Sequence, residues 1–257
     1  MKTVTSKSAR AFVHAVDLPP STRGGFEGAG EIIDFKAQKD QAMVVASDIV
    51  AFVKGVSNER RQDIVNASLL AQLVANKKVP DKTNMIEWYN AYFDVLENIG
   101  WVVQNKTFSS YTEEADGLEA HEAILKVAAV FLGAAPAALA VVTSTLEALK
   151  SMDPSKPWVT IFDRESKHVK TGHFQIALAE QGENDQFLVS LMAFSLNAQS
   201  TLTNILFFKI RNDEAELQKC SGKVTINDQV LSDVRDLVRQ KITTHVSEYI
   251  AKLPDLV

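Results

Sequence analysis

Residues 173–196 read HFQIALAEQGENDQFLVSLMAFSL and contain two apolar runs joined by a polar turn. The first run, residues 173–180, alternates between apolar and polar side chains, which is typical of a β-strand. The second run, residues 187–196, has no charge and is apolar on both faces, so as a strand it needs cover on both sides. This stretch therefore predicts a hairpin inside a sheet that lies between other layers.

The sequence around this hairpin continues the β pattern. Residues 157–226 hold the further runs PWVTIF, NILFFKI and AELQKCSGKVTI, separated by short polar stretches. Such spacing predicts an antiparallel β-meander. Residues 11–18 predict a leading edge strand, which ends at two consecutive prolines.

Helical spacing of apolar residues predicts helices before and after the meander. Residues 34–115 are expected to be mostly helical, and their first part, residues 34–77, predicts an antiparallel helical hairpin. Residues 84–100 predict an aromatic-rich helix, and residues 228–252 predict a C-terminal amphipathic helix. We therefore expect one α/β (α+β) domain over residues 1–257, in which a mainly antiparallel β-sheet is sandwiched between two layers of α-helices.

The helical region at residues 118–150 contains a long uncharged segment. No charge occurs between Lys126 and Glu147, which is enough length for a helix to cross a bilayer. Gly133 and Pro136 interrupt the segment, which predicts a kink or two helices with Pro136 in a first turn. The alanine-rich composition favours a helix buried against the sheet over a membrane span.

Composition argues against several classes of function. A net charge of −5 and a pI near 5.6 provide no basic field, so we expect no nucleic-acid partner. The five histidines lack metal-ligand spacing, and His168 and His173 are expected to meet as a solvated pair across a turn. No sequence motif frames a nucleophile with its base. We therefore expect no metal, no cofactor and no enzymatic activity.

A resemblance to a known family rests on three stretches within residues 122–226. These are HEAILKVAAVFLG, KPWVTIFDRES and NILFFKIRNDEAELQ, in that order. In these motifs, in its length and in its expected order of elements, the chain resembles the Cyt family of cytolysins. It is also similar, more distantly, to Evf-like virulence factors.

This resemblance implies a toxin that opens its helical layers on a bilayer. The bilayer is then permeabilised by an inserted oligomeric pore or by detergent-like action. The implied partners are membrane lipids and further copies of the chain. Residues 1–16 lack the apolar run of a secretory signal, so we expect a bacterial protein that is secreted or released without an ordinary signal peptide and acts at a target-cell membrane.

The expected strand at residues 187–196 has ten residues without a charge, enough to cross a bilayer when tilted, which takes about 9–11 residues. The apolar run at residues 205–210 is the second strand expected to insert. We therefore expect membrane insertion at Phe187, Leu188, Val189, Leu191, Met192, Phe194, Leu196, Ile205, Leu206, Phe207, Phe208 and Ile210. The resemblance also implies activation by terminal trimming, for which Arg10, Arg23 and Lys252 are candidates near the chain ends.

Cys220 is the only cysteine, so the chain holds no internal disulfide. A lone cysteine at the end of an apolar strand is a candidate for fatty acylation, which the Evf-like resemblance allows and which would add membrane affinity. The alternative is an unmodified packing residue.

The residues leave a second function open. The same fold suits a non-lytic carrier of a hydrophobic ligand, or an interaction protein, with the ligand between the layers near Trp88, Tyr89 and Tyr92. A lipid that co-purifies with the protein would favour the carrier.

Overall fold

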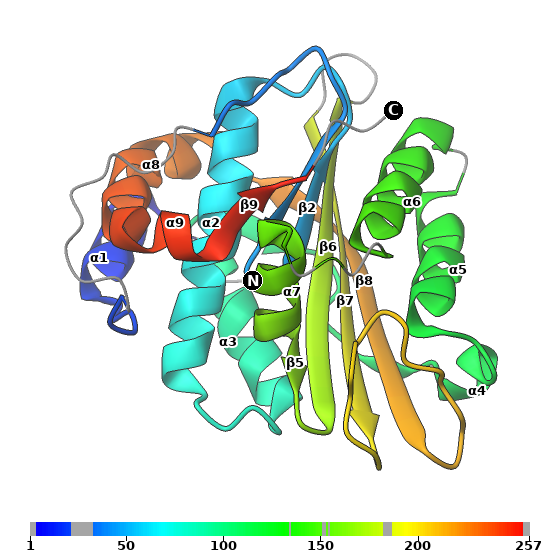
Figure 1. The fold of residues 1–257 in the computed structure, drawn as a ribbon. Helices are drawn as coiled ribbons and strands as arrows, with labels where there is room; N and C mark the ends of the chain where they lie inside the picture. The colour runs from blue at the N-terminus through cyan, green and yellow to red at the C-terminus, as the bar shows by residue number, and fades with distance from the viewer. Residues whose placement is uncertain are drawn as a thin grey trace.

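The computed structural model describes residues 4–21, 33–133, 135–150, 153, 155–181 and 187–253. The chain forms three layers, with one sheet between two sets of helices (Figure 1). This arrangement confirms the expected α/β class and the sandwich of a mainly antiparallel sheet between helical layers.

The strands are β1 (Gln41–Val45), β2 (Asp48–Phe52), β3 (Trp101–Val103), β4 (Ser109–Ser110), β5 (Lys167–His168), β6 (Thr171–Gln181), β7 (Phe187–Ala198), β8 (Ala215–Ile226) and β9 (Ile250–Lys252). Their order is β3-β8-β7-β6-β2-β1-β9, with β4 beside β8 and β5 beside β6. The pairing of β2 with β6 is parallel, and the other pairs between these strands are antiparallel. The expected hairpin of residues 173–196 is confirmed as β6 and β7.

The helices are α1 (Ser6–Ala15), α2 (Asn58–Lys78), α3 (Met85–Asn98), α4 (Thr112–Ala115), α5 (Ala120–Leu132), α6 (Pro136–Lys150), α7 (Pro157–Ser166), α8 (Asp228–Ile242) and α9 (Val246–Tyr249), with a 3₁₀ turn at Thr243–His245. Helices α2 and α3 cover one face of the sheet, and α1 and α8 pack beside them. Helices α5, α6 and α7 cover the other face (Figure 1). The sheet thus separates two hydrophobic cores.

The uncharged segment is split into two helices, as the sequence predicts. Gly133 ends α5 with a positive φ of 59°, a conformation that glycine adopts readily, and Pro136 is the first residue of α6. Within the described residues, no helix is both long and apolar enough to cross a membrane.

The expectation of a strand at residues 11–18 is wrong, because residues 11–15 belong to α1 and residues 16–18 form no regular element. Thr5 and Ser8 form a capping box that starts the helix. Ala9 and Val13, four residues apart, are buried on the side that packs on α8. The apparent alternation was therefore one face of a short helix.

The expected helical hairpin at residues 34–77 is also wrong. Its first half is the β1–β2 hairpin, which turns at Ala46, a residue with a positive φ of 52°. All ten residues of the two strands are buried. A strand that is apolar on both faces has no clear period, so its apolar residues also matched helical spacing. Only the second half, α2, is helical.

Two further stretches expected as strands have other structures. Pro157 opens α7, because proline suits the first turn of a helix. Residues 204–210 form an irregular connection between β7 and β8, in which the Asn204 side chain accepts hydrogen bonds from two backbone N–H groups. Ile205 packs directly on Gly172, so this apolar run fills the core instead of joining the sheet. The C-terminal helix is shorter than the expected 228–252. Helix α8 ends at Ile242, a 3₁₀ turn and the short α9 follow, and the last residues of the range form β9.

Candidate functional site

The β6–β7 hairpin presents two chemically different faces. The face under α5, α6 and α7 carries a continuous apolar band, and each of its members is at most 1% exposed. We call this set the apolar band: Phe174, Ile176, Leu178, Met192, Phe194 and Leu196. The strand register pairs Phe174 with Phe194 and Ile176 with Met192, so the band runs across both strands.

The opposite face of the hairpin is more polar and lies under α2 and α3. Thr171, His173 and Gln175 alternate along β6 on this face and are buried. The Tyr89 hydroxyl, from α3, lies 3.1 Å from the Phe174 carbonyl oxygen and 2.7 Å from that of Phe194. A single α3 side chain therefore contacts the backbone of both strands.

A buried polar group also joins α2 and α3 to β2. The Asp48 carboxylate accepts hydrogen bonds from the hydroxyls of Ser68 and Tyr92. Burial raises the pKa of Asp48 to about 7, against the effect of these two hydrogen bonds, which lower it. Gln72 extends the contact, because its amide nitrogen donates to the Val45 carbonyl at 2.6 Å.

The sequence contained a signal for this polar contact. Ser68, Gln72 and Asn76 recur every four residues along α2, on one stripe of a helix that is buried from Asp63 to Ala75. Ser68 and Gln72 turn toward β2 and the β1–β2 turn, and Asn76 accepts a hydrogen bond from the indole of Trp88 at 2.8 Å. A polar stripe on a buried helix indicates a satisfied network rather than a surface.

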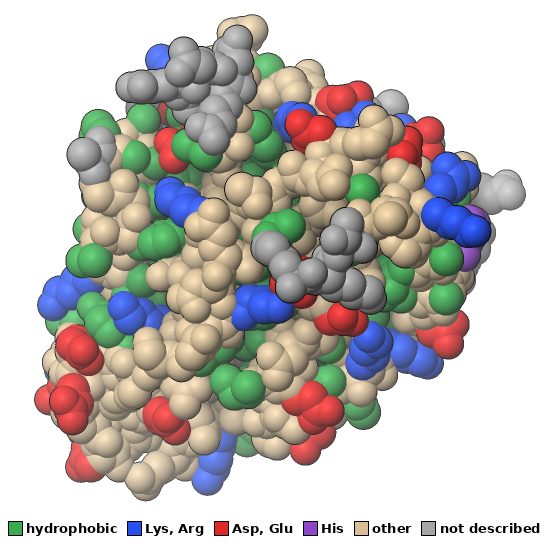
Figure 2. Space-filling view, turned by 180° about the vertical axis from the view of Figure 1, so that it is seen from behind, with side chains coloured by type: hydrophobic (Ala, Val, Ile, Leu, Met, Phe, Trp, Pro, Cys, Tyr) green, Lys and Arg blue, Asp and Glu red, His purple; other side chains and the backbone are tan. Residues whose placement is uncertain are grey.

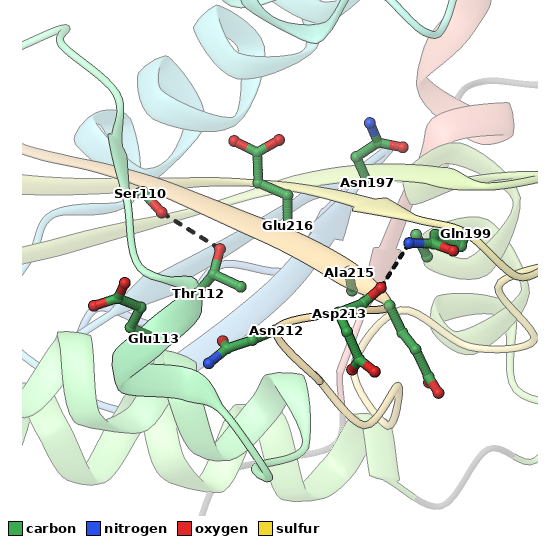
Figure 3. Close-up of a pocket in the computed structure, with 11 residues that line it drawn as sticks. Ser110, Thr112, Glu113, Asn197, Gln199, Asn212, Asp213, Ala215 and Glu216 are labelled. Atoms are coloured by element: carbon green, nitrogen blue, oxygen red, sulfur yellow. Dashed lines mark hydrogen bonds between the residues drawn. The ribbon is translucent and has the colours of Figure 1, made fainter.

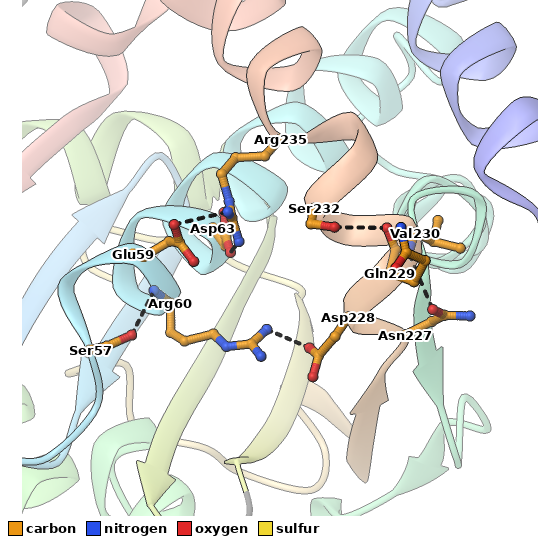
Figure 4. A network of polar contacts seen from close by, with 10 residues as sticks. All are labelled: Ser57, Glu59, Arg60, Asp63, Asn227, Asp228, Gln229, Val230, Ser232 and Arg235. Carbon is orange, nitrogen blue, oxygen red and sulfur yellow. Dashed lines mark hydrogen bonds and ion pairs between the residues drawn. The ribbon is translucent and has the colours of Figure 1, made fainter.

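Helix α8 is fastened to α2 by ion pairs (Figure 4). Arg235 donates to both carboxylate oxygens of Asp63, at 2.7 and 2.8 Å, and lies 2.9 Å from Glu59. Arg60 pairs with Asp228 at the start of α8, at 2.5 Å. Bidentate arginine–carboxylate pairs are the stronger class of ion pair, so this side of the molecule is held by directional bonds.

The α5–α6 hairpin is attached mainly by apolar packing. Helix α6 packs on β1, β2 and β6 through small and aliphatic side chains such as Ala138, Val142 and Leu146. The hydroxyls of Thr143 and Thr145 bond to carbonyls of their own helix. At its base, α5 is joined to the connection after β7 by backbone hydrogen bonds, for example from His121 N–H to the Leu206 carbonyl.

The surface also carries apolar side chains on this side. Val130, on α5, is 83% exposed. Seen from behind, hydrophobic side chains reach the surface at several places between charged groups (Figure 2).

The two histidines expected to meet do so. The rings of His168 and His173 stack with centroids 5.9 Å apart, and His173 packs on Trp88 at 4.3 Å. The expectation of a solvated pair is wrong, since His173 is 2% exposed. Burial, together with the nearby Lys82 charge, lowers the pKa of both histidines. Among the described residues, no group of three or more metal-ligating side chains comes together.

A polar cavity of about 540 Å³ opens at one end of the sheet (Figure 3). Ser110, Thr112, Asn197 and Gln199 contribute hydrogen-bonding groups, and the Gln199 amide donates to the Asp213 carbonyl at 2.6 Å. Four carboxylates also line it: Glu113, Asp213, Glu214 and Glu216. This lining does not suit a hydrophobic ligand. Trp88, Tyr89 and Tyr92, the expected ligand contacts of a carrier, are at most 1% exposed and pack on one another.

Cys220 faces α3 from β8 and is 4% exposed. Its thiol donates to the Asn105 carbonyl at 3.4 Å, and burial raises its pKa to about 11. The thiol is therefore neutral at physiological pH and covered by the chain, so its acylation remains a prediction that requires local opening.

The candidate trimming positions are not at loose ends where they are described. Arg10 lies within α1, and Lys252 lies in β9, which pairs with β1. Arg23 is outside the described residues. Cleavage at Arg10 or Lys252 requires prior opening of a regular element.

No protein-family profile and no curated protein matches this chain. Solved structures of similar arrangement include a delta-endotoxin, with 16% identity, 81% of this chain and 90% of that chain covered, and a TM-score of 0.42. The Evf virulence factor has 10% identity, coverage of 77% and 82%, and a TM-score of 0.36. Activated Cyt2Ba from Bacillus thuringiensis subsp. israelensis has 14% identity, coverage of 70% and 97%, and a TM-score of 0.32. Both groups that the sequence motifs resemble therefore recur among the structural neighbours.

Proposed function

We propose that this protein is a membrane-active toxin that binds lipid bilayers and permeabilises them after the α5–α6 hairpin leaves the sheet. One observation carries the proposal. The apolar band of the β6–β7 hairpin is fully buried, and its cover is held mainly by apolar side chains.

The α5–α6 hairpin is the layer that opens, because its apolar contacts and the hydrogen bonds of α2 and α3 respond differently to transfer from water to lipid. In water, uncovering the apolar band is costly, because about 25 cal/mol is lost for each Å² of apolar surface exposed. In a bilayer that cost disappears, because hydrocarbon replaces the helices as the apolar neighbour. The hydrogen bonds that hold α2 and α3 gain no such replacement in lipid. A bilayer therefore favours release of α5–α6 selectively.

The active protein has membrane lipids as its partners and acts as an assembly of several copies on the membrane. Several copies are needed because strands in hydrocarbon require a closed barrel in which all backbone groups are paired. The source is a bacterial cell that releases the protein toward a target cell. No enzymatic step, metal, cofactor or nucleic acid takes part.

The first test is dye release from phosphatidylcholine vesicles, before and after mild trypsin treatment. We expect leakage that increases with dose, and more leakage from trimmed protein. Absence of leakage from protein shown to be folded would contradict the proposal and leave the carrier function as the better account.

A pair of disulfide locks then tests which layer opens. In a Cys220→Ser background, one cysteine pair joins α6 to β2 and a matched pair joins α2 to β2, with Cα atoms about 4.4–6.8 Å apart. We expect the α6 lock to abolish leakage until reductant is added, whereas the α2 lock leaves leakage intact. Undiminished leakage with the α6 bond verified would rule out release of this layer.

A further inference from the structure

We infer that the β6–β7 hairpin alone enters the bilayer, with its apolar band turned to the lipid, while β8 stays outside. This inference rests on the proposed function and specifies which part of the sheet contacts hydrocarbon. It differs from an insertion of all three long strands, β6, β7 and β8, which the fold also offers.

The length of the hairpin matches a bilayer. Residues 172–180 pair with residues 188–196 in continuous antiparallel register. Nine residues on each strand meet the lower end of the roughly 9–11 that a tilted strand needs to cross the hydrocarbon. Glu180, which lies on the same face as the apolar band, is the last residue of this span and sits at the far interface.

The two faces of the hairpin determine its orientation. The apolar band lies on one face, whereas Thr171, His173 and Gln175 alternate on the other face of β6. Ser195 pairs with His173 and Asn197 pairs with Thr171, so the polar half of that face spans both strands. In a closed barrel the lumen is polar and the lipid side is apolar, which places the band outward.

Strand β8 does not fit the same environment. On the face that β8 shares with the apolar band, Lys219 pairs with Phe194 and Lys223 pairs with Ser190. In the closed protein the Lys219 ammonium lies over the Tyr111 ring, and the Lys223 ammonium lies over the Phe131 ring and donates to Ser190 at 2.7 Å. If β8 entered the bilayer beside β7, both lysines would face the hydrocarbon, where lysine is strongly unfavourable.

The directions of the strands also indicate that each copy inserts the two-stranded β6–β7 hairpin. Since β6, β7 and β8 are successively antiparallel, β6 and β8 run in the same direction. A barrel built from three strands per copy would therefore join neighbouring copies by a parallel pair. A barrel built from the β6–β7 hairpin is antiparallel throughout, as in bacterial outer-membrane barrels.

The β6–β7 and β7–β8 connections differ in the length and in the number of charged side chains that would have to cross the membrane. Residues 182–186, between β6 and β7, are the five residues GENDQ. The connection from β7 to β8 is longer and includes Lys209, Arg211 and Asp213. Its apolar side chains are, in addition, packed against α5 and Gly172. The shorter segment, residues 182–186, is the less costly one to translocate.

Neighbouring cysteines on β7 and β8 test the inference in a Cys220→Ser background. Met192→Cys reports the apolar band, and Ser221→Cys reports β8, because these residues are cross-strand partners on the same face. Ala193→Cys reports the opposite face of β7. Each protein is incubated with phosphatidylcholine vesicles and treated with a charged thiosulfonate in the water or with pyrene maleimide dissolved in the bilayer. Leakage is recorded on the same samples.

We expect at least a tenfold preference for the bilayer reagent at Met192→Cys and the reverse preference at Ser221→Cys and Ala193→Cys. Leakage with lipid-side reaction at both Met192→Cys and Ser221→Cys would overturn the inference in favour of three inserted strands. Leakage with lipid-side reaction at neither would overturn it in favour of detergent-like action or helix insertion. Absence of leakage from the Cys220→Ser parent would instead contradict the proposed function itself.

Discussion

The two helical layers cover the same sheet by different physical means. Helices α2 and α3 are fixed by directional bonds, such as those of Tyr89 to two strand carbonyls and of Ser68 and Tyr92 to Asp48. The α5–α6 hairpin covers the same face as the apolar band and is held mainly by alanine, valine and leucine side chains. A bilayer offers no replacement for the first kind of contact, whereas its hydrocarbon can replace the apolar neighbours of the second.

Because of this difference, the stability of the whole fold in water and the ease with which α5–α6 leaves the sheet are separate properties. A protein can be stable in water and still part along one interface when the solvent changes, provided that this interface is apolar. The buried polar contacts then determine which part of the molecule remains folded.

The largest effect is expected from Asp48, which lies within the α2–α3 interface. Its pKa is raised from 3.8 to about 7 in the folded protein, so the folded state retains a proton that the unfolded state releases. This contribution to stability is complete below pH 4 and is lost as the pH rises to about 7, a change of about 4 kcal/mol at most.

Asp48→Asn removes that titration and can keep the acceptor oxygen for Ser68 and Tyr92. We expect the variant to be more stable than the parent at pH 8, with a flatter dependence of the free energy of unfolding on pH between 4 and 8. Denaturant unfolding at several pH values measures this. Parallel pH curves for the two proteins would show that Asp48 does not titrate in this range.

A matched pair of core leucines compares the layers directly. Leu146 of α6 and Leu70 of α2 are buried, at 3% and 0% exposure. Either leucine-to-alanine substitution is expected to lower the free energy of unfolding by about 2–4 kcal/mol. We expect only Leu146→Ala to accelerate vesicle leakage, by about tenfold, since 1.4 kcal/mol of weakened closure corresponds to that factor. Equal acceleration by Leu70→Ala would show that global stability, and not the α5–α6 layer, controls release.

Tyr89→Phe tests the polar hold on the hairpin. The substitution removes one hydroxyl that contacts the Phe174 and Phe194 carbonyls and keeps the ring in place. We expect a loss of about 1–2 kcal/mol in the free energy of unfolding and a severalfold faster leakage. Tyr111→Phe is a control on the other side of the sheet, at a less buried position. Slower leakage from Tyr89→Phe would mean that the contact assists insertion instead of restraining it.

The smallest effect on stability is expected at the exposed Val130. Val130→Lys places a charge on the outer surface of α5, where substitutions usually change the free energy of unfolding by less than about 0.5 kcal/mol. If α5–α6 moves into lipid, the charge should still weaken binding to phosphatidylcholine vesicles, as measured by flotation. Val169→Lys, at another exposed valine, serves as the control. Equal binding by both variants would place the first lipid contact elsewhere.

Sequence patterns could predict only part of the fold. Apolar runs with distinct turns marked β6 and β7, and Gly133 and Pro136 marked the division between α5 and α6, because these signals are local. The same reasoning failed for β1 and β2, where burial on both faces erased the strand period. It also failed at residues 204–210, whose apolar side chains fill the core from an irregular connection.

Local sequence patterns also predicted only part of the candidate membrane-contacting site. Phe187–Leu196 was expected to reach lipid and does form a strand, but the expectation did not distinguish the two faces of that strand. The two faces differ because they meet different partners that lie far away in the chain. Tyr89 of α3 contacts the Phe194 carbonyl from one side, and Lys219 of β8 lies beside the Phe194 side chain on the other face. Sequence spacing alone does not report such neighbours.

By itself, the sequence determined the three-layer class, the long central hairpin and the break in the uncharged helical segment, since each depends on the period, composition or backbone preference of adjacent residues. Only the tertiary structure decided which layer is held by polar bonds and which by apolar contact. That difference arises where Asp48 meets Ser68 and Tyr92, and where the Phe174 ring packs on those of Phe162 and Phe194. Burial and pairing of this kind exist only once distant segments have packed together.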